Sequence, residues 1–338
     1  MKVLVNGIGN IGTTLISVLQ NYKNALGITE IYALKNTPQP WHKEDLEYLT
    51  SLGVKICTRD NNDSYLSLEK IIDDVDYIFD CTNNGGGLAN KKWYTELPNL
   101  KGASAQGSEK NFGISFMSGI NNTALKGVKY SHIVSCNTHS IASLLTTFTG
   151  LELDNLKSAD FVIVRRSEDI GNHQRLVSAN VVARHLDDKL GTHHSIDVLD
   201  LFKTIGKTFK VTSSDITTPS QLMHGVRFNI ELNTALNEEQ IHACIDKNNL
   251  ISKSTKFDSN VIFERGRRIS PQGRIYSHAI VISNNIMAVD NRIMGWAFIP
   301  QEGNTILSTI HAFLLQTGNH SENQLMRDLV KDLIWDEW

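Results

Sequence analysis

A glycine-rich segment close to the start of the chain constrains its fold more than any other feature. The apolar run Lys2–Asn6 has the pattern of a strand buried on both faces, and the segment Gly7–Gly12 follows it directly. Thr13–Leu19 then carries apolar residues at helical spacing. A strand, a GxGxxG turn and a helix in this order form a phosphate-binding turn, in which N–H groups at the start of the helix face a pyrophosphate. The chain is therefore expected to begin with a dinucleotide-binding fold.

Each glycine of this turn has a physical purpose. Gly7 makes the tight turn, Gly9 lets the pyrophosphate approach the backbone, and Gly12 lets the helix pack against the strand. The alternative is a glycine-rich turn that holds no ligand. The candidates for cofactor binding in the turn are Gly7, Gly9, Asn10, Ile11 and Gly12.

Short strands alternate with helical segments through the first 138 residues. This alternation predicts an α/β fold, a Rossmann-type parallel sheet with helices on both faces. In such a sheet the ligand lies at the carboxyl ends of the strands, so Thr82 and Gly107, which end two of these segments, are further cofactor candidates. The expected strands after the first lie in Glu30–Leu34, Val54–Cys57, Asp76–Thr82 and Gly102–Gly107.

The end of the second strand bears on which nicotinamide cofactor is used. A site specific for NAD would carry an aspartate or glutamate there to bind the ribose 2′-hydroxyl, whereas this chain has Lys35, Asn36 and Thr37. A cation and two hydrogen-bonding side chains suit a 2′-phosphate, so we expect NADP to be accepted alongside NAD. A solvated lysine at a strand end is the alternative.

A cysteine stands between a predicted strand, Tyr130–Ser135, and a predicted helix, Ser140–Leu145. At such a junction Cys136 faces the positive end of the helix dipole, which lowers the pKa of its thiol. The backbone N–H groups there could also stabilise an oxyanion on a carbonyl that the thiolate attacks. Cys136 is therefore the candidate nucleophile. The other cysteines are interpreted as small buried hydrophobic residues: Cys57, Cys81 and Cys244.

Several short motifs, spread in order along most of the chain, resemble one family. The chain is similar to glyceraldehyde-3-phosphate dehydrogenases, and within them to the archaeal (type II) branch. Ser135–Thr138 resembles the nucleophile segment of that family. The other matching segments are Val5–Gly12, Asp80–Thr82, Gln106–Lys110, Val164–Arg166, His193–His194 and Pro219–His224.

The resemblance implies a reaction and roles for two residues. Cys136 would attack the aldehyde of glyceraldehyde 3-phosphate to form a thiohemiacetal. Hydride transfer to the nicotinamide would leave a thioester, which inorganic phosphate would convert to 1,3-bisphosphoglycerate, a step of glycolysis and gluconeogenesis. His224 would be the base and later the acid, with an imidazole pKa suited to that exchange near neutrality.

The resemblance also implies the residues that surround the reacting groups. Arg165 would contact the cofactor, as would Gln301 at the entry to a C-terminal helix. An exposed, ion-pairing arginine pair is the alternative for Arg165 and Arg166. The substrate and phosphate candidates are Ser135, Asn137, Thr138, Arg166, His193 and His194. The chain departs from the family pattern at Asn172–Arg175, which lacks the usual prolines, and at Ser195–Asp197, where the family has Gly-Pro-Asp.

A chain of 338 residues exceeds what one hydrophobic core usually organises, so two domains are expected. The dinucleotide-binding domain should span 1–138 and be completed by a C-terminal helix within about 300–338. The catalytic domain should span 139–299, an α+β unit with a mainly antiparallel or mixed sheet. Its expected elements are the strands Phe161–Val164, Gly225–Leu232 and Ala279–Ile282 and the helix Glu238–Asn248.

Composition excludes several classes of protein and partner. The formal net charge is -3, without the basic surplus of a nucleic-acid binder. No apolar run approaches the roughly 20 residues that cross a membrane. The four cysteines are scattered without a CxxC pair, so no metal site is expected and a cytoplasmic location fits. A homotetramer is implied by the resemblance alone.

Two other functions remain open from the sequence. The same thioester chemistry could act on another aldehyde, such as a semialdehyde or erythrose 4-phosphate. Alternatively, the chain could be a cofactor-binding protein without catalysis, although the presence of both Cys136 and His224 argues against that.

Overall fold

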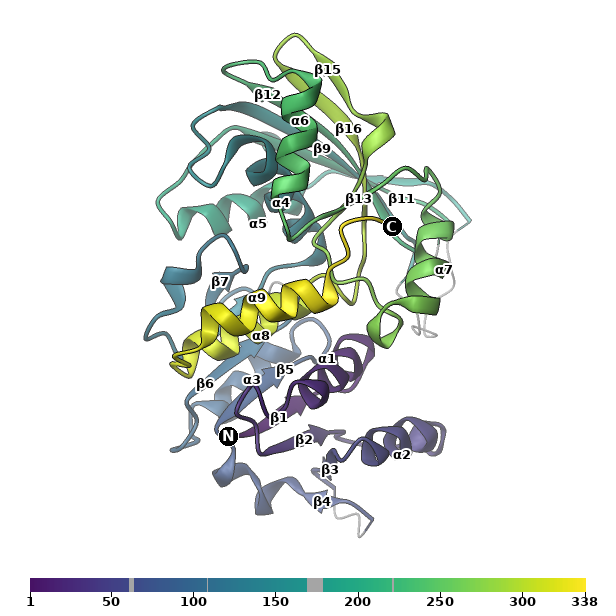
Figure 1. Cartoon of the computed structure of the whole chain (residues 1–338). Coiled ribbons are helices and arrows are strands. Elements are labelled where there is room, and N and C mark those ends of the chain that lie inside the picture. Colours follow the sequence, from purple (N-terminus) through teal and green to yellow (C-terminus); the bar gives the residue numbers. More distant parts are fainter. Residues whose placement is uncertain (61–63, 108, 169–178, 221) are drawn as a thin grey trace. The chain divides into compact units, whose positions relative to one another are not determined.

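The computed structural model describes residues 1–60, 64–107, 109–168, 179–220 and 222–338 (Figure 1). The chain forms two compact units. Met1–Val134 and Ile306–Arg327 make the first, and Ser135–Thr305 and Asp328–Trp338 make the second. The first break lies four residues before the expected boundary, and the last eleven residues go with the second unit. The departing segment Asn172–Arg175, with Ser108 and Gln221 of the matching motifs, lies outside the described residues.

The first unit contains an eight-stranded sheet in which every neighbouring pair is parallel. This confirms the predicted parallel sheet. The strand order is β4-β3-β2-β1-β5-β6-β8-β7, so β1 lies between β2 and β5. The order reverses at β1, which creates the crevice where open α/β sheets bind ligands. The strands are β1 (Lys2–Asn6), β2 (Glu30–Leu34), β3 (Lys55–Thr58), β4 (Leu66–Ser67), β5 (Tyr77–Asp80), β6 (Gly102–Ala105), β7 (Ile114–Phe116) and β8 (Tyr130–Ile133).

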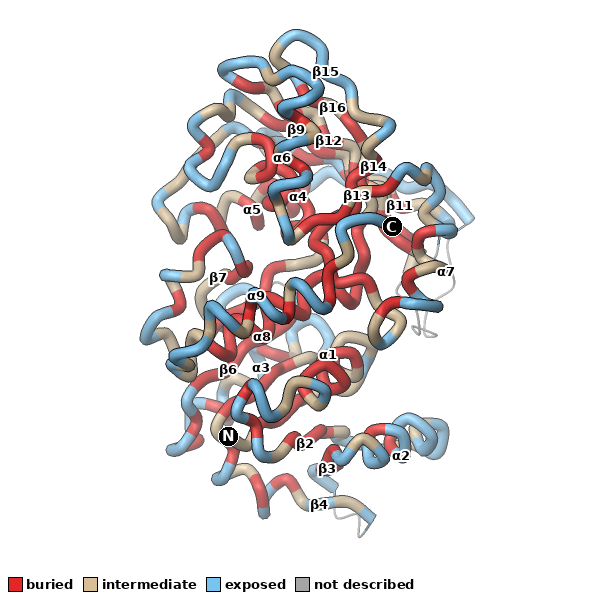
Figure 2. Tube along the Cα trace, viewed as in Figure 1, coloured by how far each residue is buried: buried red, intermediate tan, exposed pale blue. Residues whose placement is uncertain are grey.

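Helices pack on this sheet and bury their apolar faces against it. The strands are among the buried segments of the unit, as Figure 2 shows in red. The C-terminal helix α8 contacts β6, β8 and α1, and its residues Ile306–Leu314 are all buried. Helix α8 therefore belongs to the first unit. The helices of this unit are α1 (Asn10–Asn21), α2 (Lys43–Ser51), α3 (Gly86–Tyr94), α8 (Ile306–Gln316) and the first part of α9 (Glu322–Leu333).

The second unit contains a mixed sheet in the order β10-β11-β9-β12-β16-β14-β13, with β15 beside β16. Most pairs are antiparallel, while β11 with β9 and β13 with β14 are parallel. This confirms the predicted mixed sheet. The strands are β9 (Leu156–Arg165), β10 (Val182–Arg184), β11 (Val211–Thr217), β12 (His224–Leu232), β13 (Ser252–Ser254), β14 (Ile280–Ile282), β15 (Met287–Val289) and β16 (Arg292–Ile299).

Alternating side chains determine which face of this sheet is covered. Along β12 every second residue is buried, from His224 to Leu232. Helix α4 packs against β9, β12 and β16, and α5 packs against β11. The buried ends of β11 and β12 therefore lie under helices that also carry predicted site residues. The helices are α4 (Cys136–Thr149), α5 (His193–Lys203), α6 (Glu238–Lys247), α7 (Ser259–Ile269) and the last part of α9.

The aromatic C-terminal segment, for which the sequence offers no role, has a structural one. Trp338 is fully buried in a cluster with Ile262 and Ile275, and its ring stacks on Trp335 at 4.8 Å. We expect Trp338→Ala to lower the free energy of unfolding by about 3–5 kcal/mol, because the substitution removes a large core side chain. Urea denaturation measures this. Trp41→Ala is the matched control, since Trp41 is 65% exposed, and a loss at Trp338 no larger than at Trp41 would contradict the assignment.

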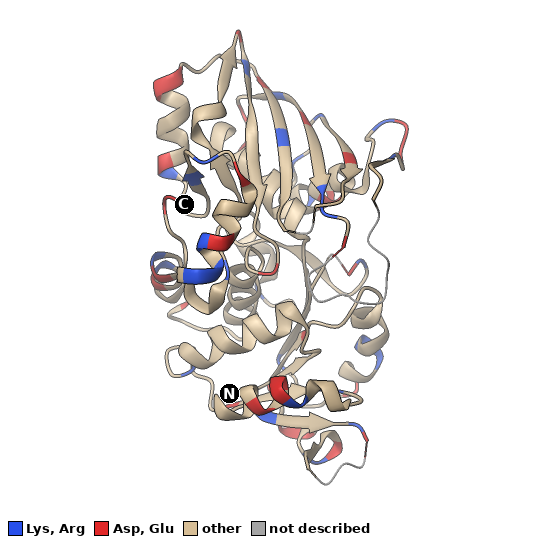
Figure 3. Ribbon diagram, turned by 90° about the vertical axis from the view of Figure 1, so that its right-hand side faces the viewer, with Lys and Arg blue, Asp and Glu red and all other residues tan. Residues whose placement is uncertain are grey.

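Charged residues of both signs are interspersed along the described part of the chain (Figure 3). Among the described residues, no helix is both long and apolar enough to cross a membrane.

Candidate active site

The glycine turn of the first unit has the shape that a bound phosphate requires. Gly7 has a φ of +95°, and a Cβ there would lie 2.8 Å from the Cys81 carbonyl oxygen. A Cβ on Gly12 would lie 2.0 Å from the Gly7 carbonyl oxygen. A Cβ on Gly9 would meet nothing within 4 Å, so open space lies beside the residue that precedes α1. The turn therefore fits a pyrophosphate at the start of this helix.

The other cofactor candidates of the first unit lie at the same edge of its sheet. Lys35, Asn36 and Thr37 follow β2, and the Gly7 N–H donates to the Leu34 carbonyl oxygen at 3.3 Å, which ties this strand end to the glycine turn. Burial lowers the pKa of Lys35, while the charge of Asp45 opposes that shift. Lys35 is a cation at this edge that could meet a 2′-phosphate.

A buried carboxylate that the sequence analysis did not select organises the loop after β5. The N–H and Oγ1 of Thr82 both donate to Oδ1 of Asp80, the former at 3.0 Å. Oδ2 of Asp80 accepts from Tyr94 at 2.5 Å and from Asn90 at 2.9 Å. Thr82 is therefore held in place, while Gly107, with a φ of +76°, follows β6 at the same edge.

In the second unit the candidate nucleophile is the first residue of a helix. Helix α4 begins at Cys136, four residues before the predicted start, because Ser135 caps it and its Oγ accepts from the Thr138 N–H at 3.2 Å. The two side chains are also hydrogen-bonded, because Oγ1 of Thr138 lies 2.9 Å from Oγ of Ser135. Asn304 donates to the Cys136 carbonyl oxygen at 3.1 Å. The thiol is thus held in the first turn, where the helix dipole is strongest.

The side-chain amide of Asn137 contacts both the candidate nucleophile and the candidate base. Nδ1 of His224 lies 2.9 Å from Oδ1 of Asn137, and Sγ of Cys136 lies 4.0 Å from the same oxygen. An amide oxygen only accepts hydrogen bonds, so Nδ1 carries the proton. In a neutral ring the lone pair is then on Nε2, which is the form that accepts a proton. Asn137 therefore sets the tautomer of His224.

The surroundings of His224 determine its charge. Burial lowers the pKa of His224 well below its usual value, and the positive charges of Arg166 and Arg165, followed by His194, lower it further. The expectation of a pKa near neutrality is therefore wrong for this structure. The ring is neutral at pH 7, ready to accept a proton, and would be a strong acid once protonated.

The two arginines predicted from the family pattern are paired with carboxylates. Arg166 is buried and forms an ion pair with Glu302 at 2.5 Å, and it also donates to the Leu222 carbonyl oxygen at 3.1 Å. Arg165 lies 3.7 Å from Oδ2 of Asp215, so both arginines have part of their charge compensated. The alternative of an exposed pair is excluded for Arg166.

The carboxylates Asp215 and Glu302 were missed at the sequence level. Glu302 directly follows Gln301, which the resemblance had singled out, so it could have been found there. Asp215 occupies a buried position of a strand that alternates buried and exposed residues. An isolated aspartate in the sequence indicates a buried functional residue only when the strand that carries it is known.

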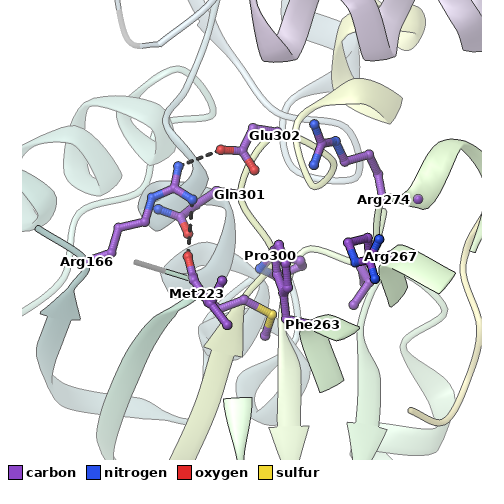
Figure 4. Close-up of a pocket in the computed structure, with 11 residues that line it drawn as sticks. Arg166, Met223, Phe263, Arg267, Arg274, Pro300, Gln301 and Glu302 are labelled. Atoms are coloured by element: carbon purple, nitrogen blue, oxygen red, sulfur yellow. Dashed lines mark hydrogen bonds and ion pairs between the residues drawn. The ribbon is translucent and has the colours of Figure 1, made fainter. Parts of the chain in front are cut away.

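A pocket lies in the second unit beside Gln301 (Figure 4). Oε1 of Gln301 accepts a hydrogen bond from the backbone N–H of His224 at 3.2 Å. A residue that lines the pocket is therefore in direct contact with the candidate base. Three arginines line the pocket, and two of them, Arg267 and Arg274, have no counterpart among the predicted site residues. Residues labelled around it are Arg166, Met223, Phe263, Arg267, Arg274, Pro300, Gln301 and Glu302.

The predicted site residues are divided between the two units. The glycine turn, Lys35, Asn36, Thr37, Thr82 and Gly107 lie in the first unit. Cys136 and His224 lie in the second, together with the other substrate candidates. The predicted cofactor residues Arg165 and Gln301 also lie in the second unit, where they contact Asp215 and the His224 backbone. Their contact with a cofactor stays a prediction.

Several archaeal proteins are similar to this chain in sequence. No protein-family model matches the sequence. A Methanobacterium bryantii protein is 26% identical over 250 residues, which cover 71% of this chain and 70% of the relative. One from Sulfolobus acidocaldarius is 28% identical over 241 residues, 66% of this chain and 64% of the relative. One from Methanobrevibacter smithii is 23% identical over 335 residues, 96% of both chains. All three are named glyceraldehyde-3-phosphate dehydrogenase, so this chain is similar in sequence to archaeal proteins of that name.

Proposed function

We propose that the protein oxidises D-glyceraldehyde 3-phosphate to 1,3-bisphosphoglycerate with NAD(P) and inorganic phosphate. The observation that carries the proposal is the shared contact of Cys136 and His224 with the Asn137 amide at the start of α4. The name of the archaeal relatives supports the same reaction. A homotetramer remains a prediction from the resemblance, and a cytoplasmic location remains a prediction from the scattered cysteines.

In the first half of the reaction Cys136 is the nucleophile. Its sulfur attacks the aldehyde carbon, and the thiol proton passes to Nε2 of His224, which is unprotonated because Asn137 holds the proton on Nδ1. The N–H groups of the first turn of α4 stabilise the oxyanion that develops on the former aldehyde oxygen. Return of the proton from Nε2 to this oxygen gives the thiohemiacetal on Cys136.

The first unit supplies the cofactor site in this proposal. Gly7 and Gly12 form the turn, open space beside Gly9 admits the pyrophosphate, and Lys35 with Asn36 and Thr37 meets the adenosine ribose. A bound nicotinamide dinucleotide supplies the hydride acceptor for oxidation of the thiohemiacetal.

In the second half inorganic phosphate attacks the thioester carbon, and the thiolate of Cys136 leaves. Arg166, His193 and His194 are the candidates to hold the two phosphate groups, as the resemblance implies, and Arg165 is the candidate to contact the cofactor. Because the arginines are paired with Asp215 and Glu302, each is held in a defined orientation at the cost of part of its positive charge.

Lys35→Ala tests the cofactor site. We expect the substitution to lower kcat/KM for NADP about tenfold or more, because a charge-assisted contact to the 2′-phosphate is lost, and to change NAD little. Steady-state kinetics with each cofactor measures the difference. Lys43→Ala, an exposed lysine of α2, is the control. Equal losses for both cofactors would show that Lys35 does not contact the 2′-phosphate.

Substrate comparison tests the aldehyde. We expect kcat/KM to be higher for glyceraldehyde 3-phosphate than for erythrose 4-phosphate, a semialdehyde or unphosphorylated glyceraldehyde. A preference for one of the others would move the proposal to that aldehyde while leaving the thioester chemistry intact.

A further inference from the structure

A buried carboxylate of the second unit lies on a residue whose backbone conformation disfavours it. Glu302 lies on the turn that follows β16, and its φ is +63°, in the left-handed region that favours glycine. Its side chain is buried. Residues in this conformation persist where the surrounding structure uses them, and they cluster at functional sites. The Glu302 carboxylate is therefore expected to have a function of its own.

The register of the strands brings Glu302 to the same edge of the sheet as Arg166 and His224. His224, the first residue of β12, pairs with Ile299 at the end of β16. Strand β9 pairs with the other side of β12 and ends one residue before Arg166. At this edge Nη2 of Arg166 lies 2.5 Å from Oε1 of Glu302, and both side chains are buried. The candidate base therefore begins its strand between the two partners of an ion pair.

This ion pair faces the pocket beside Gln301. Arg166 and Glu302 both line the pocket, and their side chains point toward one another (Figure 4). Arg267 and Arg274 line it as well, so its described lining residues carry three guanidinium groups and one carboxylate. A pocket lined with an excess of positive charge suits an anion. The Glu302 carboxylate then occupies a place on Arg166 that a ligand oxygen could take.

We propose that Glu302 competes with a bound phosphate group for Arg166 and so limits how tightly that group is held. The proposal rests on the proposed function, in which Arg166 is a candidate to hold phosphate. Carboxylate and phosphate oxygens accept the same charge-assisted hydrogen bonds from a guanidinium, so one can replace the other. The limit matters because the product of the proposed reaction carries two phosphate groups and must leave after every turnover.

The backbone around the ion pair is fixed, so an exchange of partners involves side chains. Nη1 of Arg166 donates to the Leu222 carbonyl oxygen at 3.1 Å, a contact that does not depend on Glu302. On the turn itself, a Cβ on Gly303 would lie 2.1 Å from the Ile275 carbonyl oxygen, which shows how closely the two segments pack. The guanidinium therefore keeps its place when a phosphate oxygen replaces the carboxylate.

Anion binding tests the proposal without turnover. The full chain is titrated with sodium phosphate and with sodium sulfate by calorimetry, at an ionic strength matched with NaCl, and Tm is measured at each anion concentration. Glu302→Gln should bind each anion about tenfold or more tightly than the native protein, because a like charge beside the anion is removed. Either anion should also raise the Tm of this variant more than that of the native protein, because it binds a guanidinium that has lost its carboxylate.

Four further variants make the test specific. Glu231→Gln is the matched control, since Glu231 lies at the opposite end of β12 and is paired with Lys157, and its anion binding should equal that of the native protein. Glu302→Asp keeps the carboxylate and should restore the native response. Where Glu302→Gln does not fold, Glu302→Gly replaces it, because glycine suits a φ of +63° and removes the same charge. The double variant Arg166→Met with Glu302→Gln should lose the gain.

Steady-state kinetics gives a readout that a merely structural carboxylate would not move. In the dehydrogenase assay Glu302→Gln should lower both KM for phosphate and kcat, because the anions are held more tightly and the product leaves more slowly. A structural role predicts a KM that is unchanged or higher.

Three results would overturn the proposal. They are equal or weaker anion binding by Glu302→Gln, an equal gain in Glu231→Gln, and a gain that persists in the double variant. Failure of the proposed reaction is distinguishable from these results. A native protein without dehydrogenase activity whose Glu302→Gln variant gains anion affinity contradicts the reaction and supports the competition. An active native protein whose Glu302→Gln variant shows no gain contradicts the competition alone.

Discussion

Cys136→Ser is expected to lower aldehyde oxidation by roughly 10³-fold or more while leaving cofactor binding unchanged. A serine hydroxyl is almost entirely protonated at neutral pH, and no thioester can form on it. The first turn of α4 should be preserved, because the Ser135 cap and the Asn304 contact to the backbone do not use the sulfur. Initial rates of cofactor reduction, together with cofactor titration by intrinsic fluorescence, measure the two effects separately.

The matched control for this variant is Cys244→Ser. Cys244 lies on α6, is only partly buried and is not one of the candidate site residues. We expect its loss to change the rate little. Substantial oxidation by Cys136→Ser, or an equal loss in the Cys244 variant, would remove Cys136 from the role of nucleophile.

His224→Gln is expected to lower kcat by about 10²- to 10⁴-fold, the range that a positioned general base contributes. Glutamine can still hydrogen-bond to Asn137 but cannot take up the thiol proton. Stopped-flow measurement of the first turnover separates this step from product release. His185→Gln provides a control, because His185 is exposed and its contact is with Asp188.

The pH profile gives the same assignment a second test. Because burial and the arginines lower the pKa of His224, its base form persists below pH 6.5 and is lost only as the pH falls through the lowered value. The acid limb of kcat/KM should therefore lie below pH 6.5 in the native protein and disappear in His224→Gln. A limb above pH 6.5 that depends on His224 would contradict a neutral, buried ring.

Elements with a strong local signal could be predicted from the sequence. Strands β1 and β2 have the predicted bounds, Lys2–Asn6 and Glu30–Leu34, because continuous apolar runs bounded by turn residues indicate buried parallel strands. Helix α6 also begins at the predicted Glu238, where Asn237 and Gln240 form a capping box.

Elements that depend on distant partners could not be predicted in the same way. Strand β11 contains two serines, two threonines and an aspartate, and it forms because β9 and β10 pair with it from both sides. Its buried Asp215 was consequently missed, and with it the carboxylate that compensates Arg165. Helical periodicity predicts the start of α4 at Ser140, four residues too late, because it does not register Ser135, whose side chain can cap a helix.

The candidate site likewise has parts that the sequence predicts and parts that depend on contacts between distant residues. The residue types of Cys136, His224 and the glycine turn could be chosen from the sequence because each carries a chemistry or a backbone requirement of its own. The contact of His224 with Asn137 could not, because it joins the start of α4 to the start of β12, 87 residues apart. Only the folded chain shows that the amide of Asn137 determines which nitrogen of His224 carries the proton.

The measurement that tests the proposed reaction most directly is a spectrophotometric assay with D-glyceraldehyde 3-phosphate, with and without inorganic phosphate, using NADP and NAD in turn. The expected result is cofactor reduction that turns over only when phosphate is present and that disappears in Cys136→Ser. Absence of reduction with either cofactor, although the protein binds the cofactor, would contradict the proposed reaction. Sustained turnover without phosphate would contradict the release of the thioester by phosphate.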